Sequence, residues 1–234
     1  MALPQLNDLP KYDLVIPSTK ESVTFRPFLV KEQKVLLMAL EAGDEKQILR
    51  AILDTIAHCL EKKINVDKLA TFDIEYMFTQ IRSKSAGETT KLNLKCIECD
   101  EQTETVVNLD EIKIEVNNED HIIELNDTYS LKMRYPSPAG ILLNTTTGDT
   151  ITQAIFEMIV MCLDEIRTEE EIIKFDEETR ENIDKFVEGL TTSQLEKLMN
   201  FVNNLPKLRH DIEFECSSCS HKNKITLEGL QDFF

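Results

Sequence analysis

Two Cys-x-x-Cys pairs that lie far apart in the chain constrain its fold more than any other feature. Cys96 and Cys99 form the first pair, Cys216 and Cys219 form the second, and 116 residues separate them. A two-residue spacer lets a tight turn direct both sulfurs at one point, and four thiolates complete the tetrahedral shell of a structural zinc site. We therefore predict that these four cysteines bind one Zn²⁺ ion. Such a closed shell leaves no position for a catalytic water.

Each pair lies between two segments in which apolar and polar residues alternate, so each is expected at the tip of a β-hairpin. A compact zinc ribbon has only about 15 to 20 residues between its pairs. The sequence thus predicts a split zinc-ribbon-like module, residues 88–109 with 207–234, and an inserted region over 110–206. Three alternatives remain open here: a redox dithiol in each pair, metal-free turns, and His221 as a ligand in place of one thiolate.

The rest of the chain predicts an α+β fold. Residues 1–87 should form an N-terminal β-hairpin (12–16 and 22–26) and a helical cluster, with helices over 28–43, 44–60 and 72–83. The inserted region reads as β followed by α. Its expected strands cover 111–116, 121–125 and 129–135, and its expected helices cover 150–163 and 192–203. The acidic tract 164–188 is interpreted as a solvated helix face that ends at Gly189.

Composition excludes several functions. With 43 acidic against 26 basic residues the net charge is −17, which disfavours binding to nucleic acid or to anionic lipid. The six glycines are too widely spaced for a dinucleotide-binding or phosphate-binding loop. No apolar stretch approaches the length of a transmembrane helix, and no secretory signal is expected. Cys59 and Cys162 fall on apolar helical faces and are expected to be buried hydrophobic residues rather than nucleophiles. No catalytic motif is found, so we predict that the protein is not an enzyme.

Three segments carry a resemblance to a known family. They are KYDLVIPSTKESVTFRPFLVKEQKVLLMALEAGD near the start, TFDIEYMFTQIRSKSAGE in the middle and CSSCSHKNKITLEGLQDFF at the end. In this order they resemble the baseplate hub and hub-assembly proteins of T-even-like contractile-tailed bacteriophages. The region over 110–206 contributes least to the resemblance.

The resemblance implies a non-enzymatic role in building the central hub of the tail baseplate, with other phage hub proteins as partners. It also implies a location in the cytoplasm of the infected bacterium or in the baseplate of the virion. The alternative function is a zinc-ribbon protein that binds nucleic acid. Lys91, Lys95, Lys222 and Lys224 near the cysteine pairs favour that alternative, and neighbouring acidic residues oppose it.

Overall fold

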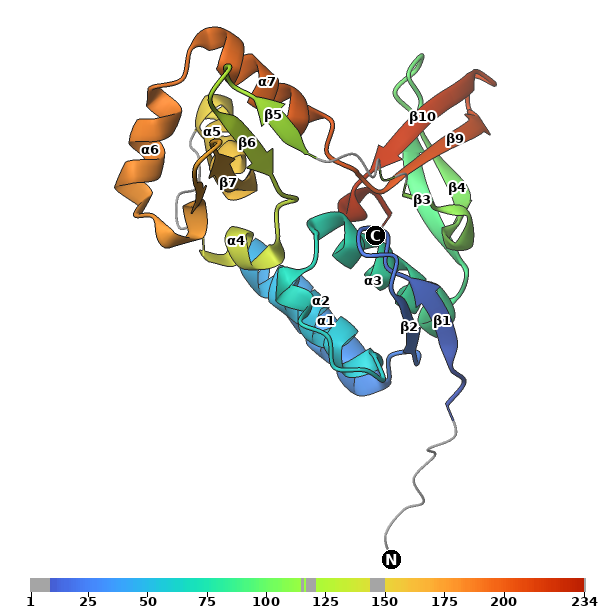
Figure 1. The fold of residues 1–234 in the computed structure, drawn as a ribbon. Helices are drawn as coiled ribbons and strands as arrows, with labels where there is room; N and C mark the ends of the chain where they lie inside the picture. The colour runs from blue at the N-terminus through green and yellow to red at the C-terminus, as the bar shows by residue number, and fades with distance from the viewer. Residues whose placement is uncertain (1–8, 115, 117–120, 144–149, 234) are drawn as a thin grey trace, which may run out of the picture. The chain divides into compact units, whose positions relative to one another are not determined.

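The computed structural model describes residues 9–114, 116, 121–143 and 150–233 (Figure 1). Its elements are a mixture of β-hairpins and helices, which confirms the α+β class. The chain separates into two compact units. Unit 1 comprises Met1–Val116 and Pro206–Phe234, and unit 2 comprises Asn117–Leu205. No helix in the described ranges is long and apolar enough to cross a membrane.

Unit 1 begins with the predicted hairpin and three helices. Strands β1 (Tyr12–Val15) and β2 (Ser22–Phe25) pair antiparallel, and they precede α1 (Val30–Ala42), α2 (Glu45–Cys59) and α3 (Thr71–Ala86). Gly43 ends α1 in the left-handed conformation, with φ of 68°, which glycine adopts without steric cost. Asp44 caps α2, because its carboxylate accepts hydrogen bonds from the amides of Lys46 and Gln47.

A buried carboxylate fixes the hairpin turn to α3. Asp73 is fully buried, and it accepts hydrogen bonds from the backbone amides of Ser18 (2.9 Å) and Ala70 (3.1 Å) and from the Ser18 hydroxyl. Burial raises the pKa of Asp73, against the lowering effect of these donors. The contact therefore ties two segments that are 55 positions apart.

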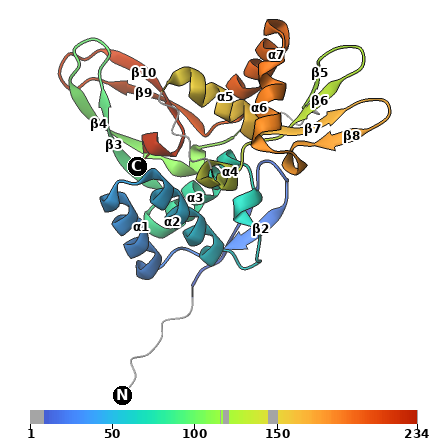
Figure 2. The ribbon, with the colours of Figure 1, turned by 90° about the vertical axis from the view of Figure 1, so that its left-hand side faces the viewer.

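The two Cys-x-x-Cys segments form matching hairpins that lie side by side in both views (Figures 1 and 2). Strand β3 (Thr89–Lys95) pairs with β4 (Gln102–Asn108), and β9 (Arg209–Glu215) pairs with β10 (Lys222–Glu228). Both hairpins contribute to one apolar core, which includes Phe233 near the end of the chain and comprises Leu94, Val107, Leu109, Ile112, Leu208, Ile212, Phe214, Leu227 and Phe233. Shared burial thus joins a segment near the middle of the sequence with one at its C-terminal end.

Unit 2 contains a four-stranded antiparallel sheet in the order β5–β6–β7–β8. The strands are Ile122–Glu124, Ser130–Met133, Leu163–Arg167 and Ile172–Lys174, and the helices are α4 (Pro138–Leu143), α5 (Ile151–Cys162), α6 (Arg180–Glu188) and α7 (Thr192–Asn203). Alternate residues of β6, Leu131 and Met133, are buried in a core shared with α5, α6 and α7. One face of the sheet is therefore covered by helices.

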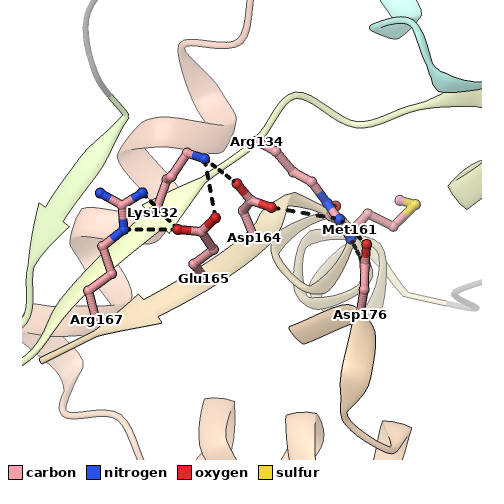
Figure 3. A network of polar contacts seen from close by, with 7 residues as sticks. All are labelled: Lys132, Arg134, Met161, Asp164, Glu165, Arg167 and Asp176. Atoms are coloured by element: carbon pink, nitrogen blue, oxygen red, sulfur yellow. Dashed lines mark hydrogen bonds and ion pairs between the residues drawn. The ribbon is translucent and has the colours of Figure 1, made fainter. Parts of the chain in front are cut away.

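Figure 3 shows the ion pairs that link the strands of this sheet to the segment after β8. The Arg134 guanidinium donates two hydrogen bonds to Asp176, at 2.7 and 2.9 Å, and a third to the carbonyl of Met161 at 3.3 Å. On β6 and β7, Lys132 pairs with Asp164 at 2.8 Å, and Arg167 pairs with Glu165. This network connects β6 with β7 and with the short 3₁₀ helix Phe175–Glu177.

Two sequence-based expectations were wrong. Residues 111–116 do not form a strand: a 3₁₀ helix covers Leu109–Glu111, and Lys113 makes one isolated bridge to Arg209, while residue 115 lies outside the described ranges. The tract 164–188 is not one helix but holds most of β7, then β8, a 3₁₀ turn and α6. Strand pairing in the sheet outweighs the helix preference of the acidic residues there. The helix α6 does end before Gly189, as expected.

Besides the cysteine pairs, a second local structure occurs once in the first half of the chain and once in the second half. Each has a helix with the pattern Ile-x-x-x-Ile-x-x-Cys-Leu, which covers residues 52–60 in the first half and 155–163 in the second. In each half the Cys carbonyl accepts the amide of an arginine: Arg26 bonds to Cys59 at 2.9 Å, and Arg134 bonds to Cys162 at 2.7 Å. The residue before each arginine bridges the leucine after the cysteine, as Phe25 with Leu60 and Met133 with Leu163. The same local arrangement of arginine, cysteine and leucine thus occurs twice in the chain.

Candidate metal centre

Each cysteine pair occupies a tight turn of the same geometry. In the first turn the Cys96 amide donates to the Glu101 carbonyl at 2.9 Å, and the Asp100 amide donates to the Cys96 carbonyl at 3.0 Å. In the second turn Cys216 and Ser220 make the equivalent bonds, at 2.9 and 3.0 Å. The residue after the second cysteine is left-handed in both turns, with φ of 59° at Asp100 and 58° at Ser220. These turns direct both sulfurs of a pair to the same side.

The two turns bring all four sulfur atoms together. They lie within 4.8 Å of one another, and two close contacts join different hairpins: Cys96 to Cys219 at 3.7 Å and Cys99 to Cys216 at 3.6 Å. A tetrahedral zinc site with Zn–S bonds of about 2.3 Å has S···S edges of about 3.8 Å. The contacts between the hairpins match that edge. Cys96 and Cys216 are buried, whereas Cys99 and Cys219 are exposed.

Reciprocal hydrogen bonds between the hairpins hold this arrangement. The Ser217 amide donates to the Thr103 hydroxyl oxygen at 3.1 Å, and the Ile97 amide donates to the Asn223 side-chain oxygen at 3.0 Å. Thr103 and Asn223 each lie four positions after the second cysteine of their pair. Sequence reasoning missed both residues, although their equivalent position in the repeat was a usable signal. They orient the turns that carry the sulfurs and do not belong to the sulfur cluster themselves.

The electrostatics of the cluster favour a bound cation. Amides of Cys219 and Ser218 lower the pKa of Cys216 to about 6. At Cys96 burial raises the pKa, but the amides of Cys99 and Glu98 together with side-chain hydrogen bonds to Asn223 and Cys219 lower it more.

The exposed cysteines behave in the opposite way. At Cys99 the Glu101 amide lowers the pKa, but the neighbouring sulfurs and burial raise it, to about 12 in total. At Cys219 the sulfurs of Cys216 and Cys96 likewise raise the pKa, against the lowering effect of the His221 amide. Four thiolates crowded together repel one another, and a divalent cation among them removes that repulsion.

The structure bears on two of the alternatives considered from the sequence. His221 does not belong to the cluster of possible metal ligands found among the described residues, and its carbonyl accepts the Cys216 amide in the turn instead. The sulfur contacts of 3.6 and 3.7 Å join cysteines of different pairs, as one four-sulfur site requires.

The other candidate residues lie elsewhere. Cys59 and Cys162 are buried at the ends of α2 and α5, and burial raises the pKa of both thiols, to about 11 and about 12. Such thiols remain protonated and are poor nucleophiles at neutral pH. Neither takes part in the sulfur cluster.

The family of this chain is shown by a comparison with family models. The model described as T4 bacteriophage base plate protein matches residues 9–234. The chain belongs to that family. No curated protein and no solved structure matches it in the corresponding searches. As a T4 base plate family member the chain belongs among phage baseplate structural proteins, and other baseplate proteins are its implied partners. The match includes both cysteine pairs and the whole of unit 2.

Proposed function

We propose that this protein takes part in building the central hub of the phage tail baseplate through contacts with other hub proteins, without catalysing a reaction. The family match over residues 9–234 is the observation that carries the proposal. The only chemically distinctive cluster among the described residues is the group of four cysteines, which suits a structural site. This function places the protein in the cytoplasm of the infected host during assembly, or in the finished baseplate.

A structural Zn²⁺ ion bound by Cys96, Cys99, Cys216 and Cys219 forms part of the proposal. The donor set supports it, because soft thiolates in tetrahedral arrangement favour zinc over hard cations. The ion would fill its shell with protein sulfur and act as a cross-link between the two hairpins. We also propose that the hairpins form a module of their own, with the region over 110–206 inserted between them.

The nucleic-acid alternative has less support, because most lysines near the cysteine pairs are in ion pairs. Lys91 pairs with Glu104 at 2.8 Å, Lys95 with Asp100 at 2.9 Å, and Lys224 with Glu213 at 3.5 Å. A surface that neutralises its own lysines has little positive charge left for phosphates.

The hub role can be tested in infected cells. An affinity-tagged copy of the chain, expressed during infection, should co-purify with other baseplate hub proteins identified by mass spectrometry. Infection without a functional copy should yield few assembled hubs. Normal hub assembly without the protein, together with an absence of hub partners, would contradict the proposal. Mass spectrometry of purified virions would then distinguish a retained component from a transient assembly factor.

The metal can be tested separately. The purified wild-type protein should contain close to one zinc per chain by elemental analysis, and Cys216→Ser should contain much less. Ser218→Ala is a matched control, because it changes an exposed residue of the same turn but removes no sulfur. Wild-type protein free of metal after purification in zinc-containing medium would contradict the zinc site and leave the hub role untouched.

A further inference from the structure

Helix α1 presents an unusual number of apolar side chains to solvent. Val30, Val35, Leu37, Met38 and Leu40 are each at least half exposed, and they account for five of the fourteen large exposed hydrophobic residues in the described ranges. Only Glu32 and Ala39 of this helix are buried. The helix packs on α2 (Figure 2), and most of its side chains remain exposed.

One side of α1 combines apolar and charged residues at helical spacing. Val30, Lys34, Leu37, Met38 and Glu41 follow the i, i+4, i+7, i+8, i+11 pattern, which places them on one face. All five are exposed. No ion pair joins the side chain of Lys34 or Glu41 to any other residue that the structure describes. We name this group of five the α1 face.

The charges along α1 are complementary to those of a second α1 that runs in the opposite direction. Lys31 and Lys34 lie in its first half, whereas Glu41 lies in its last turn and Asp44 follows it. If a second α1 runs antiparallel, with a two-fold axis between residues 37 and 38, Lys34 lies opposite Glu41. Leu37 then packs against Met38 of the other copy. Antiparallel helices also place opposite ends of their dipoles together.

The local charge permits a second acidic chain to approach here. Residues 30–46 hold three lysines and four acidic residues, and one of the acidic residues, Glu32, is buried against Arg26. This surface is close to neutral, although the whole chain carries a net charge of −17. Repulsion between two copies is therefore smaller here than the net charge of the whole chain would suggest.

We propose that the α1 face is a homodimer interface, in which α1 pairs antiparallel with α1 of a second copy. A two-fold contact of this type is self-complementary, since each copy supplies the same face. In this pairing Val30, Leu37 and Met38 of each copy would be covered by α1 of the other copy.

Charge reversal tests this pairing directly. The full-length protein should elute as a dimer of about twice 26.9 kDa by size exclusion with light scattering. Lys34→Glu and Glu41→Lys each place like charges opposite one another at two symmetric positions, so each should weaken the dimer about tenfold or more. The exposed Lys63→Glu is the control for the same charge change away from α1 and should leave the dimer intact.

Two combinations of the charge reversals distinguish this interface from any other: a mixture of the two single variants, and the double variant. A mixture of the Lys34→Glu and Glu41→Lys chains should form a heterodimer, and the double variant in one chain should regain the homodimer. Circular dichroism must show each variant folded. A wild type that remains monomeric at high concentration would overturn the proposal, as would reversals that leave the dimer unchanged or a mixture that fails to associate. Binding of the α1 face to another hub protein by a monomer would also overturn it.

Discussion

Removal of the proposed zinc ion should destabilise unit 1, because the ion would cross-link segments that are far apart in the chain. Cys99 and Cys216 are 117 positions apart. A cross-link reduces the conformational entropy of the unfolded chain by an amount that grows with the length of the closed loop. If the whole loop is unfolded, this stabilisation amounts to about 5 kcal/mol.

The expected value is smaller if unit 2 remains folded when unit 1 unfolds. Only residues 100–116 and 206–215 then form the flexible part of the loop, about 27 residues, and the same relation gives about 3.5 kcal/mol. A zinc chelator should therefore lower the unfolding free energy of unit 1 by about 3.5 to 5 kcal/mol. The Cys216→Ser variant should lose a similar amount, and the chelator should have little further effect on it.

Hydrogen exchange read by mass spectrometry along a urea series can measure each unit separately. Peptides from β3–β4 and β9–β10 should open at lower urea after metal removal. Peptides from α5 in unit 2 serve as the internal control and should keep their midpoint. Identical midpoints in unit 1 with and without zinc would refute the proposed cross-link, whereas an equal shift in both units would mean that they unfold together, the case for which about 5 kcal/mol is expected.

Three further perturbations have defined outcomes. Glu32→Gln should cost about 2 kcal/mol at neutral pH in urea unfolding. Burial raises the pKa of Glu32, but its Arg26 partner and the Leu29 amide lower it more, so the pKa in the folded state is below 4.5. The stabilisation is therefore lost as the pH falls through that pKa. A stability difference between variant and wild type that does not shrink in acid contradicts the reasoning. Gly43→Ala should lower the free energy of unfolding by about 1 kcal/mol because φ of Gly43 is positive. Gly140→Ala in α4 should leave it unchanged or raise it, as measured by thermal denaturation. The reverse order of stability would be inconsistent with these conformations. Arg134→Lys loses the two-point contact with Asp176 and should cost about 1 kcal/mol, detected by exchange in unit 2 alone.

The sequence predicted the parts of the fold that depend on local pattern. Helical spacing located α1, α2, α3, α5 and α7, and the alternation around the cysteines predicted both hairpins. The clustering of the four sulfurs also followed from the spacing and chemistry of the pairs alone. That these residues bind zinc, and that the chain divides into an N-terminal part, a split hairpin module and an inserted region, stay predictions.

What the sequence did not reveal depends on pairing between distant segments. The tract 164–188 is rich in charged residues that favour helix, yet Glu165, Ile166 and Arg167 pair with β6 on one side and β8 on the other. Thr103 and Asn223 are ordinary strand residues until the opposite hairpin supplies an amide. Local propensity carries no information about such partners.

The presence of both Cys-x-x-Cys hairpins in one chain changes how assembly of the sulfur cluster depends on protein concentration. A chain with only one of the two cysteine hairpins would contribute two thiolates, so four-sulfur coordination would require two molecules to associate. Such a complex would dissociate on dilution. With both hairpins in one polypeptide, that association becomes intramolecular, at an effective concentration in the roughly millimolar range. Coordination of the proposed ion would then persist at low protein concentration.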